Sequence, residues 1–175
     1  MASMSTAASP PPVASVRQAI ESYLLERLGS VRAEDPDGFS CRKGTTRVYV
    51  TVTDGVATAS TLVQVMAPLA IGVMPSIALF EYVGRRSDDF FIGSISVKKR
   101  DDSLVDLVFV HTLVGDHLHR EDLMVVMDVV AATADGLDEA AVATFGGTMA
   151  HDERCSPNAA DDTTSDRGTS SETRS

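Results

Sequence analysis

The amino-acid sequence predicts an α+β domain with the element order α-β-β-β-α-β-β-α, in which helices pack on a largely antiparallel sheet. Segments with alternating or continuous apolar residues follow one another through short turns, which is typical of antiparallel pairing. Three other segments have apolar residues at intervals of three and four, which is typical of amphipathic helices. No repeat with a period of roughly 20 to 50 residues is present, so a repeat protein is not expected.

The two ends of the 175-residue chain differ in composition from its middle. Residues 1–14 carry no charge and include three consecutive prolines, and residues 148–175 are acidic and rich in Ser and Thr. Such segments bury too little apolar surface to offset the entropy lost on ordering. We therefore expect one folded domain at residues 15–147 between two disordered ends.

The first element is predicted to be a helix from Ser15 to Leu28. Ser15 and Gln18 have the spacing of a capping box, which satisfies free N–H groups at a helix start. Gly29 is suited to the left-handed conformation that ends many helices.

Three strands are then predicted to form a meander, at Phe39–Lys43, Thr46–Thr53 and Thr58–Val65. In the second of these, every other residue is a valine, so one face of the strand is apolar. Asp54-Gly55 between the second and third strands is a strong hairpin signal. The meander therefore presents its valines, Val48, Val50 and Val52, to the core.

The stretch from Met66 to Met74 is predicted to be an apolar loop that leads to a helix with Pro75 at its first position and Gly84 at its end. No residue between Gly55 and Phe80 is charged, which raises the question of a membrane span. Pro68 and Pro75 interrupt this stretch, and a spanning helix needs about 20 apolar residues with intact backbone bonds. We expect no membrane association.

Two further strands and a last helix complete the predicted domain. The strands are Phe90–Lys98, which alternates, and Leu104–Leu113, which is apolar on both faces and is expected to be buried on both or to lie at a subunit contact. The helix is predicted to open at Gly115 or Asp116 and to end at Gly146-Gly147.

Composition excludes several classes of function. The net charge is −10, and no basic stripe is present, so nucleic acid is not an expected partner. The two cysteines, Cys41 and Cys155, have no metal-type or disulfide-framework spacing, and no secretory signal is found. A reduced, cytoplasmic protein is the simplest interpretation.

One group of residues could carry metal chemistry. Two histidines and a carboxylate can hold a metal ion, and His111, His117 and His119 lie near three acids, Asp116, Glu121 and Asp122. The alternative is a polar loop entering a helix, whose N-terminus attracts acids. Since phosphate-binding loops and nucleophile elbows are absent as well, we expect no enzyme, no catalytic residue and no cofactor.

An apolar surface is the stronger candidate site. Three helices are few to cover both faces of a five-stranded sheet, so the face opposite the valines is expected to keep an apolar strip. The strip and the loop that adjoins it would contain Tyr49, Leu62, Met66, Leu69, Ile71, Val73, Met74, Val108 and Val110. Apolar area of this kind often marks a protein contact, although these residues could instead pack within the monomer core.

Several short motifs resemble a known family. Thr46–Val50, Val65–Pro68, His111–Gly115, Ala134–Asp138 and Phe145–Gly147 are similar, in order and spacing, to segments of YbjN-like proteins. That family is related in fold to the type III secretion chaperones of the CesT kind, and the resemblance covers about residues 15–147.

The resemblance implies a fold with the element order given above, frequent dimerisation, and ATP-independent binding of an extended peptide or a partly unfolded client, with no catalytic residues. Our leading hypothesis is therefore a chaperone-like module that binds a protein or peptide client. One alternative is a homodimeric regulatory scaffold without a client. The other is a small metal-dependent enzyme that uses His111, His117 and His119.

Overall fold

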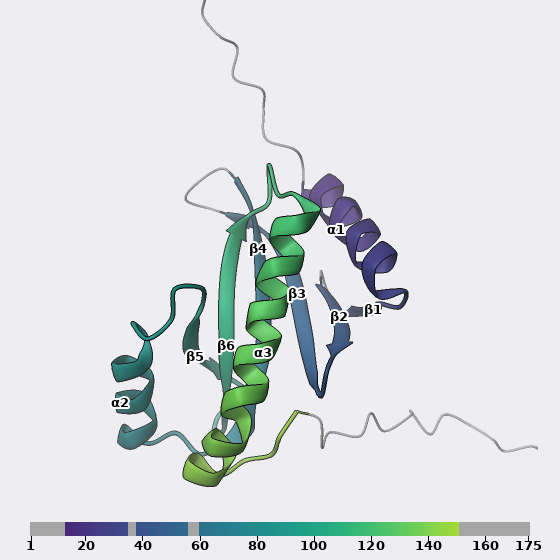
Figure 1. Cartoon of the computed structure of the whole chain (residues 1–175). Helices are drawn as coiled ribbons and strands as arrows, with labels where there is room; N and C mark the ends of the chain where they lie inside the picture. The colour runs from purple at the N-terminus through teal and green to yellow at the C-terminus, as the bar shows by residue number, and fades with distance from the viewer. Residues whose placement is uncertain (1–12, 35–37, 56–59, 151–175) are drawn as a thin grey trace, which may run out of the picture.

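The computed structural model of the chain describes residues 13–34, 38–55 and 60–150 (Figure 1). Its elements, in chain order, are α1 (Val13–Leu28), β1 (Arg32–Glu34), β2 (Gly38–Lys43), β3 (Thr46–Gly55), β4 (Ser60–Val73), α2 (Ile77–Arg86), β5 (Ser94–Lys99), β6 (Val105–Val114) and α3 (Arg120–Phe145). The predicted α+β class and element order are confirmed, with β1 as an additional strand too short for a sequence pattern. The predicted disordered ends fall almost entirely outside the described residues.

The six strands form one antiparallel sheet in the order β1-β2-β3-β4-β6-β5. β4 is the longest strand, at 14 residues, and it lies between β3 and β6 near the middle of the sheet. β6 pairs with β4 on one side and with β5 on the other, so it is an inner strand of the sheet.

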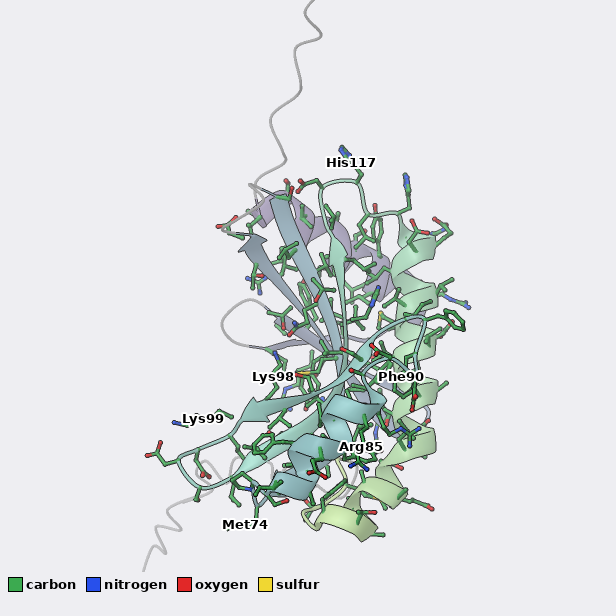
Figure 2. All side chains as sticks on the ribbon, turned by 90° about the vertical axis from the view of Figure 1, so that its left-hand side faces the viewer. Met74, Arg85, Phe90, Lys98, Lys99 and His117 are labelled. Atoms are coloured by element: carbon green, nitrogen blue, oxygen red, sulfur yellow. The ribbon has the colours of Figure 1, made fainter. Side chains whose placement is uncertain are left out.

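The helices pack on one face of the sheet. Figure 2 shows α3 running along one side of it. The alternate residues of the strands that point toward this side are fully buried: Val48, Val50, Val52, Val63, Val65, Ala67, Leu107 and Phe109. In α1, Val16, Ile20 and Leu24 recur every four residues and are buried in the same core. In α2, Leu79 is fully buried, and Tyr82 contacts Phe145 of α3 edge to face with ring centroids 5.0 Å apart.

Three predicted helix starts are wrong. α2 begins at Ile77 after the capping residue Ser76, whose Oγ accepts from Leu79 N, so Pro75 is not its first residue, and the helix ends at Arg86 and not at Gly84. α1 begins at Val13, so Ser15 lies within the first turn and is not the capping residue. α3 begins after His119, not at Gly115 or Asp116, because these two residues serve the end of the sheet: Gly115 N and Asp116 Oδ1 bond to the backbone of Thr61.

The predicted apolar loop from Met66 to Met74 is also wrong, because β4 continues through Val73. Hydrogen-bonding groups alternate between the two sides of a strand. Thr61 O accepts from Gly115 N, which follows β6, so the odd-numbered residues of β4 direct their N–H and C=O groups toward β6. The even-numbered residues face β3, and the N–H that Pro68 lacks would lie on that side. The paired register with β3 ends at Met66, so no bond of that ladder is lost. The proline is therefore compatible with an inner strand.

β5 begins at Ser94, four residues later than predicted. Gly93 has φ +82°, and a Cβ at this position would lie 2.6 Å from the Phe109 ring. Phe90 packs edge to face on Phe109 with ring centroids 5.0 Å apart. The chain before Gly93 therefore leaves the line of the strand, and only the part after it pairs with β6.

The chain just after Gly147, the predicted last residue of the domain, still contacts the sheet. Thr148 and Ile71 exchange two backbone hydrogen bonds of 2.9 Å, so the chain after α3 is attached to β4. A Cβ on Gly147 would lie 2.5 Å from Ile71 O, which makes glycine the fitting residue for this close approach.

Candidate functional site

The sheet face opposite the helices carries a row of apolar side chains. Tyr49 on β3 pairs with Met66 on β4, and Met66 pairs with Val110 on β6. All three are half-buried, and none belongs to the buried core that the helices cover. We call this face, with the row at its centre, the open face.

A second row crosses the open face toward the top of the sheet in Figure 1. Leu62 on β4 pairs with Val114 on β6, and Val114 is 58% exposed. Gln64 and Thr112 pair between the two rows, so the surface alternates apolar and uncharged polar side chains. Lys98 of β5 borders this uncharged pair, since its Nζ donates to Gln64 Oε1 at 3.4 Å.

The structure gathers only some of the predicted site residues. Tyr49, Leu62, Met66 and Val110 lie together on the open face, and Val108 shares this face but is only 2% exposed.

The remaining candidates came from the segment predicted as a loop. Leu69, Ile71 and Val73 are buried, since β4 carries them into the fold. Met74 is exposed (Figure 2), but it follows the end of β4 and precedes α2, outside the paired strands that form the row. No ligand could contact Leu69 or Val73 unless the domain opened.

One end of the sheet is basic although the chain is acidic overall. Arg47 Nη1 donates to Ser40 Oγ at 2.9 Å, and Ser40 Oγ donates to Glu34 Oε1 at 2.6 Å. A cavity of about 280 Å³ beside these strands is lined by three arginines, Arg32, Arg42 and Arg47. Two of these arginines, Arg32 and Arg47, lie within 4.0 Å of Glu34 Oε1.

Sequence reasoning missed a groove at the other end of the sheet. It has a volume of about 510 Å³ and lies between the end of β6, the segment at Ile92 and the first turns of α3. Val114 and Val125 line it and are 58% and 55% exposed. The available signal was that Val125 lies on the side of the last helix opposite its apolar stripe.

Comparison with known proteins identifies the family of the chain that carries this surface. The family model described as "T3SS (YopN, CesT) and YbjN peptide-binding chaperone 1" matches residues 14–153. The chain belongs to this peptide-binding chaperone family. The resemblance inferred from its short motifs is thereby confirmed.

A solved structure agrees with this family at the level of the fold. The chain is similar to YbjN from E. coli, described as a candidate transcription regulator, with a TM-score of 0.52 and 16% identity. The match covers 77% of this chain and 95% of that chain. No significant match was found among curated proteins. The described part of this chaperone-family chain has no helix long and apolar enough to cross a membrane.

The histidines are placed apart in this member of the peptide-binding chaperone family. His111 is on β6, where its Nδ1 accepts from Gly93 N at 3.0 Å, whereas His117 and His119 lie in the turn before α3. His117 is at the top of the molecule in Figure 2. Within residues 13–34, 38–55 and 60–150, no group of three or more His, Cys, Asp or Glu side chains could hold a metal ion.

Cys41 is positioned as a core residue. It is 5% exposed, and its Sγ lies 4.0 Å from Val48 O on the neighbouring strand. Burial raises the pKa of the Cys41 thiol, and Lys43 and Arg47 oppose this only in part. A thiol of this kind is a poor nucleophile at neutral pH.

Proposed function

We propose that this chain is a chaperone-like module that binds an extended segment of a client protein on its open face, without catalysis and without ATP. The observation that carries the proposal is the row of Tyr49, Met66 and Val110, half-buried across three paired strands. A folded monomer gains stability by covering such a row, and here all three described helices pack elsewhere. Membership of a peptide-binding chaperone family supports the same function.

The surface suits an extended client better than a helical one. Side chains on one face of an extended peptide recur at about 7 Å, which matches the spacing of alternate residues along the strands beneath. Covering the remaining exposed area of a few such side chains contributes only a few kcal/mol. Backbone hydrogen bonds to the sheet would therefore be needed for a stable complex.

The cellular setting that we propose is the cytoplasm. Cys41 is a free thiol in the described structure, and the sequence has no disulfide framework. No phosphate-binding loop occurs in the sequence, which supports binding without ATP.

A capture experiment with matched charge changes tests the client-binding proposal. Met66→Asp places a carboxylate in the row, and Ala132→Asp places the same group on the exposed side of α3. Both variants should keep the far-UV circular dichroism of the parent chain. The amount of client protein captured should fall at least about tenfold for Met66→Asp, since an unpaired charge would be desolvated in the complex. The amount captured by Ala132→Asp should equal that of the parent chain. Equal capture by the two folded variants would contradict the proposed surface.

A second candidate function, a homodimer, rests on the outer side of α2. Ile77 and Phe80 are 78% and 52% exposed there, and Met74 adjoins them in sequence. Glu81 and Arg85 pair at 3.5 Å on the same helix and could exchange partners across a twofold axis. Light scattering of the full chain and of Ile77→Asp should then show a dimer and a monomer. A monomeric parent chain would dispose of this candidate.

A further inference from the structure

The outer edge of β6 is paired over only part of its length. β5 pairs with β6 from Lys99↔Val105 to Ser94↔Val110 and then ends. β6 continues for four residues, His111 to Val114, which pair with β4 on their other side. Among the described residues, no backbone hydrogen bond fills the β5 side of this extension.

The direction of the free groups follows from the alternation of the strand. Gly115 N donates to Thr61 O at 2.7 Å, so Gly115 faces β4. Successive residues of a strand face opposite neighbours, and therefore Thr112 and Val114 face the vacant side. Each of these two residues presents one N–H and one C=O there, in the geometry of a sheet edge that can accept another strand.

The edge is vacant because of the turn at Gly93. Its positive φ takes the preceding chain out of the line of β5, and Gly93 N donates to the ring of His111 rather than to a carbonyl of β6. Phe90 is then held against Phe109 in the core. The segment that would have continued β5 is thus committed elsewhere by packing.

The groove described above lies directly beside this edge. Its lining includes Ile92, Leu113, Val114, Val125 and Val126. The one acid that lines it is Asp122, in the first turn of α3, and no ion pair of Asp122 is found within the described residues. The lining is therefore mostly apolar, and Asp122 and His117 are its two titratable side chains.

We infer that a client segment joins the sheet as an additional strand on the free edge of β6, bonded to Thr112 and Val114. Alternate side chains of this strand would enter the groove against Leu113 and Val125 and extend the open face on the other side. A lysine or arginine of the segment would reach Asp122. The inference rests on the proposed function, because it gives the binding mode and the chemistry of the client.

The preferred client segment follows from this lining. Groove-facing positions, two residues apart, call for aliphatic side chains, since Val125, Val126 and Leu113 are aliphatic. A flanking basic residue is favoured by Asp122 and by the net charge of −10, whereas an acidic one is repelled. Proline and glycine are disfavoured within the segment, because it must adopt strand geometry and donate hydrogen bonds.

The test uses the full chain and an acetylated heptapeptide. This peptide has a lysine at each end and isoleucine or leucine at alternate positions between them. Two N-methylated versions of this peptide remove amide donors from alternate residues, one set on each edge of the strand. Only one edge can face β6, so one version should bind at least about tenfold more weakly than the other, which should match the parent peptide. Changing the peptide leaves the fold of the protein untouched.

Protein variants give an independent readout. The amide hydrogens of Thr112 and Val114 should exchange about tenfold more slowly in the complex, while that of Leu113, which faces β4, should change little. Thr112→Val keeps the backbone donor and should bind as the parent chain does. Val125→Asp should weaken binding at least tenfold with unchanged circular dichroism, and replacing both peptide lysines with glutamate should weaken binding to the parent chain severalfold.

The outcomes separate this inference from the proposed function. If both N-methylated peptides bind equally, and the amide hydrogens that the peptide slows belong to Tyr49, Met66 and Val110, then binding at the edge of β6 is wrong. Binding on the open face would still be supported. If the heptapeptide does not bind at all, the edge mode is overturned, and the proposed function is judged by the Met66→Asp and Ala132→Asp comparison. Weaker binding of only one N-methylated peptide, together with slower amide exchange at Thr112 and Val114, supports the inference.

Discussion

Leu69 and Met66 lie on the same strand but have opposite structural roles, which allows a quantitative test of the fold. Leu69 is fully buried in the core, whereas Met66 is half-buried on the open face. Truncation of a buried leucine to alanine costs about 3 to 5 kcal/mol, because both transfer free energy and packing are lost. Truncation of a half-buried methionine should cost less than about 1.5 kcal/mol, since solvent fills the space.

The assay is urea unfolding of Leu69→Ala and Met66→Ala, followed by circular dichroism. A domain of this size has a free energy of unfolding of about 5 to 15 kcal/mol, so the Leu69 variant should lose a large share of it. Its melting temperature should fall by about 10 °C, and the slope of unfolding free energy against urea should be unchanged. A Leu69→Ala cost below about 1 kcal/mol, similar to that of Met66→Ala, would refute the placement of β4 in the core.

Three further predictions concern single sites. Gly93→Ala should destabilise the domain by at least about 2 kcal/mol in the same assay, because the new Cβ would lie 2.6 Å from the Phe109 ring and the positive φ is strained; a neutral effect would contradict the turn. In a Cys155→Ser background, Cys41 should react with iodoacetamide far more slowly in the folded than in the urea-unfolded chain, because burial raises the pKa of its thiol and shields it; equal rates would argue against its burial. Backbone N–H bonds from Ser103 and Leu104 lower the pKa of Asp101, so its carboxyl should titrate by NMR below the usual aspartate value. The turn should be stabilised above about pH 4, and this stabilisation should be lost as pH falls through the lowered pKa. A titration midpoint at or above about 4 would contradict those bonds.

The sequence was sufficient where local pattern and turn chemistry agree. The alternating valines of β3 and the Asp54-Gly55 signal predicted a hairpin, and β3 and β4 do pair across it. The helical repeat of α1 predicted the buried side of that helix correctly. In these segments the preferred local structure is also the one that the tertiary fold uses.

The failures occurred where tertiary context outweighs local signals. Pro68 predicted an interruption, but the β3 ladder has already ended where its missing N–H would be needed. Phe90 to Ile92 have strand-forming side chains, yet the positive φ of Gly93 and the Phe90–Phe109 contact remove them from the sheet. Neither constraint can be read from residues close in sequence.

The candidate site could be predicted only in outline. The alternation of β3 and β6 indicated which residues share a face, and Tyr49, Met66 and Val110 do lie in one row. The free edge of β6 depends on where β5 stops and on the position of Val125 beside it. Those facts are set by the register between strands and by helix placement, which no local pattern encodes.

The measurement that tests the central claim most directly is site-specific photocrosslinking of the full chain in lysate of its source cells. A photoreactive residue would be placed at position 66 on the open face or at position 132 on the exposed side of α3. We predict discrete crosslinked adducts from position 66 whose client peptides are extended segments with alternating aliphatic residues, and none from position 132. The same adducts from both positions, or adducts from position 132 alone, would contradict client binding on the open face.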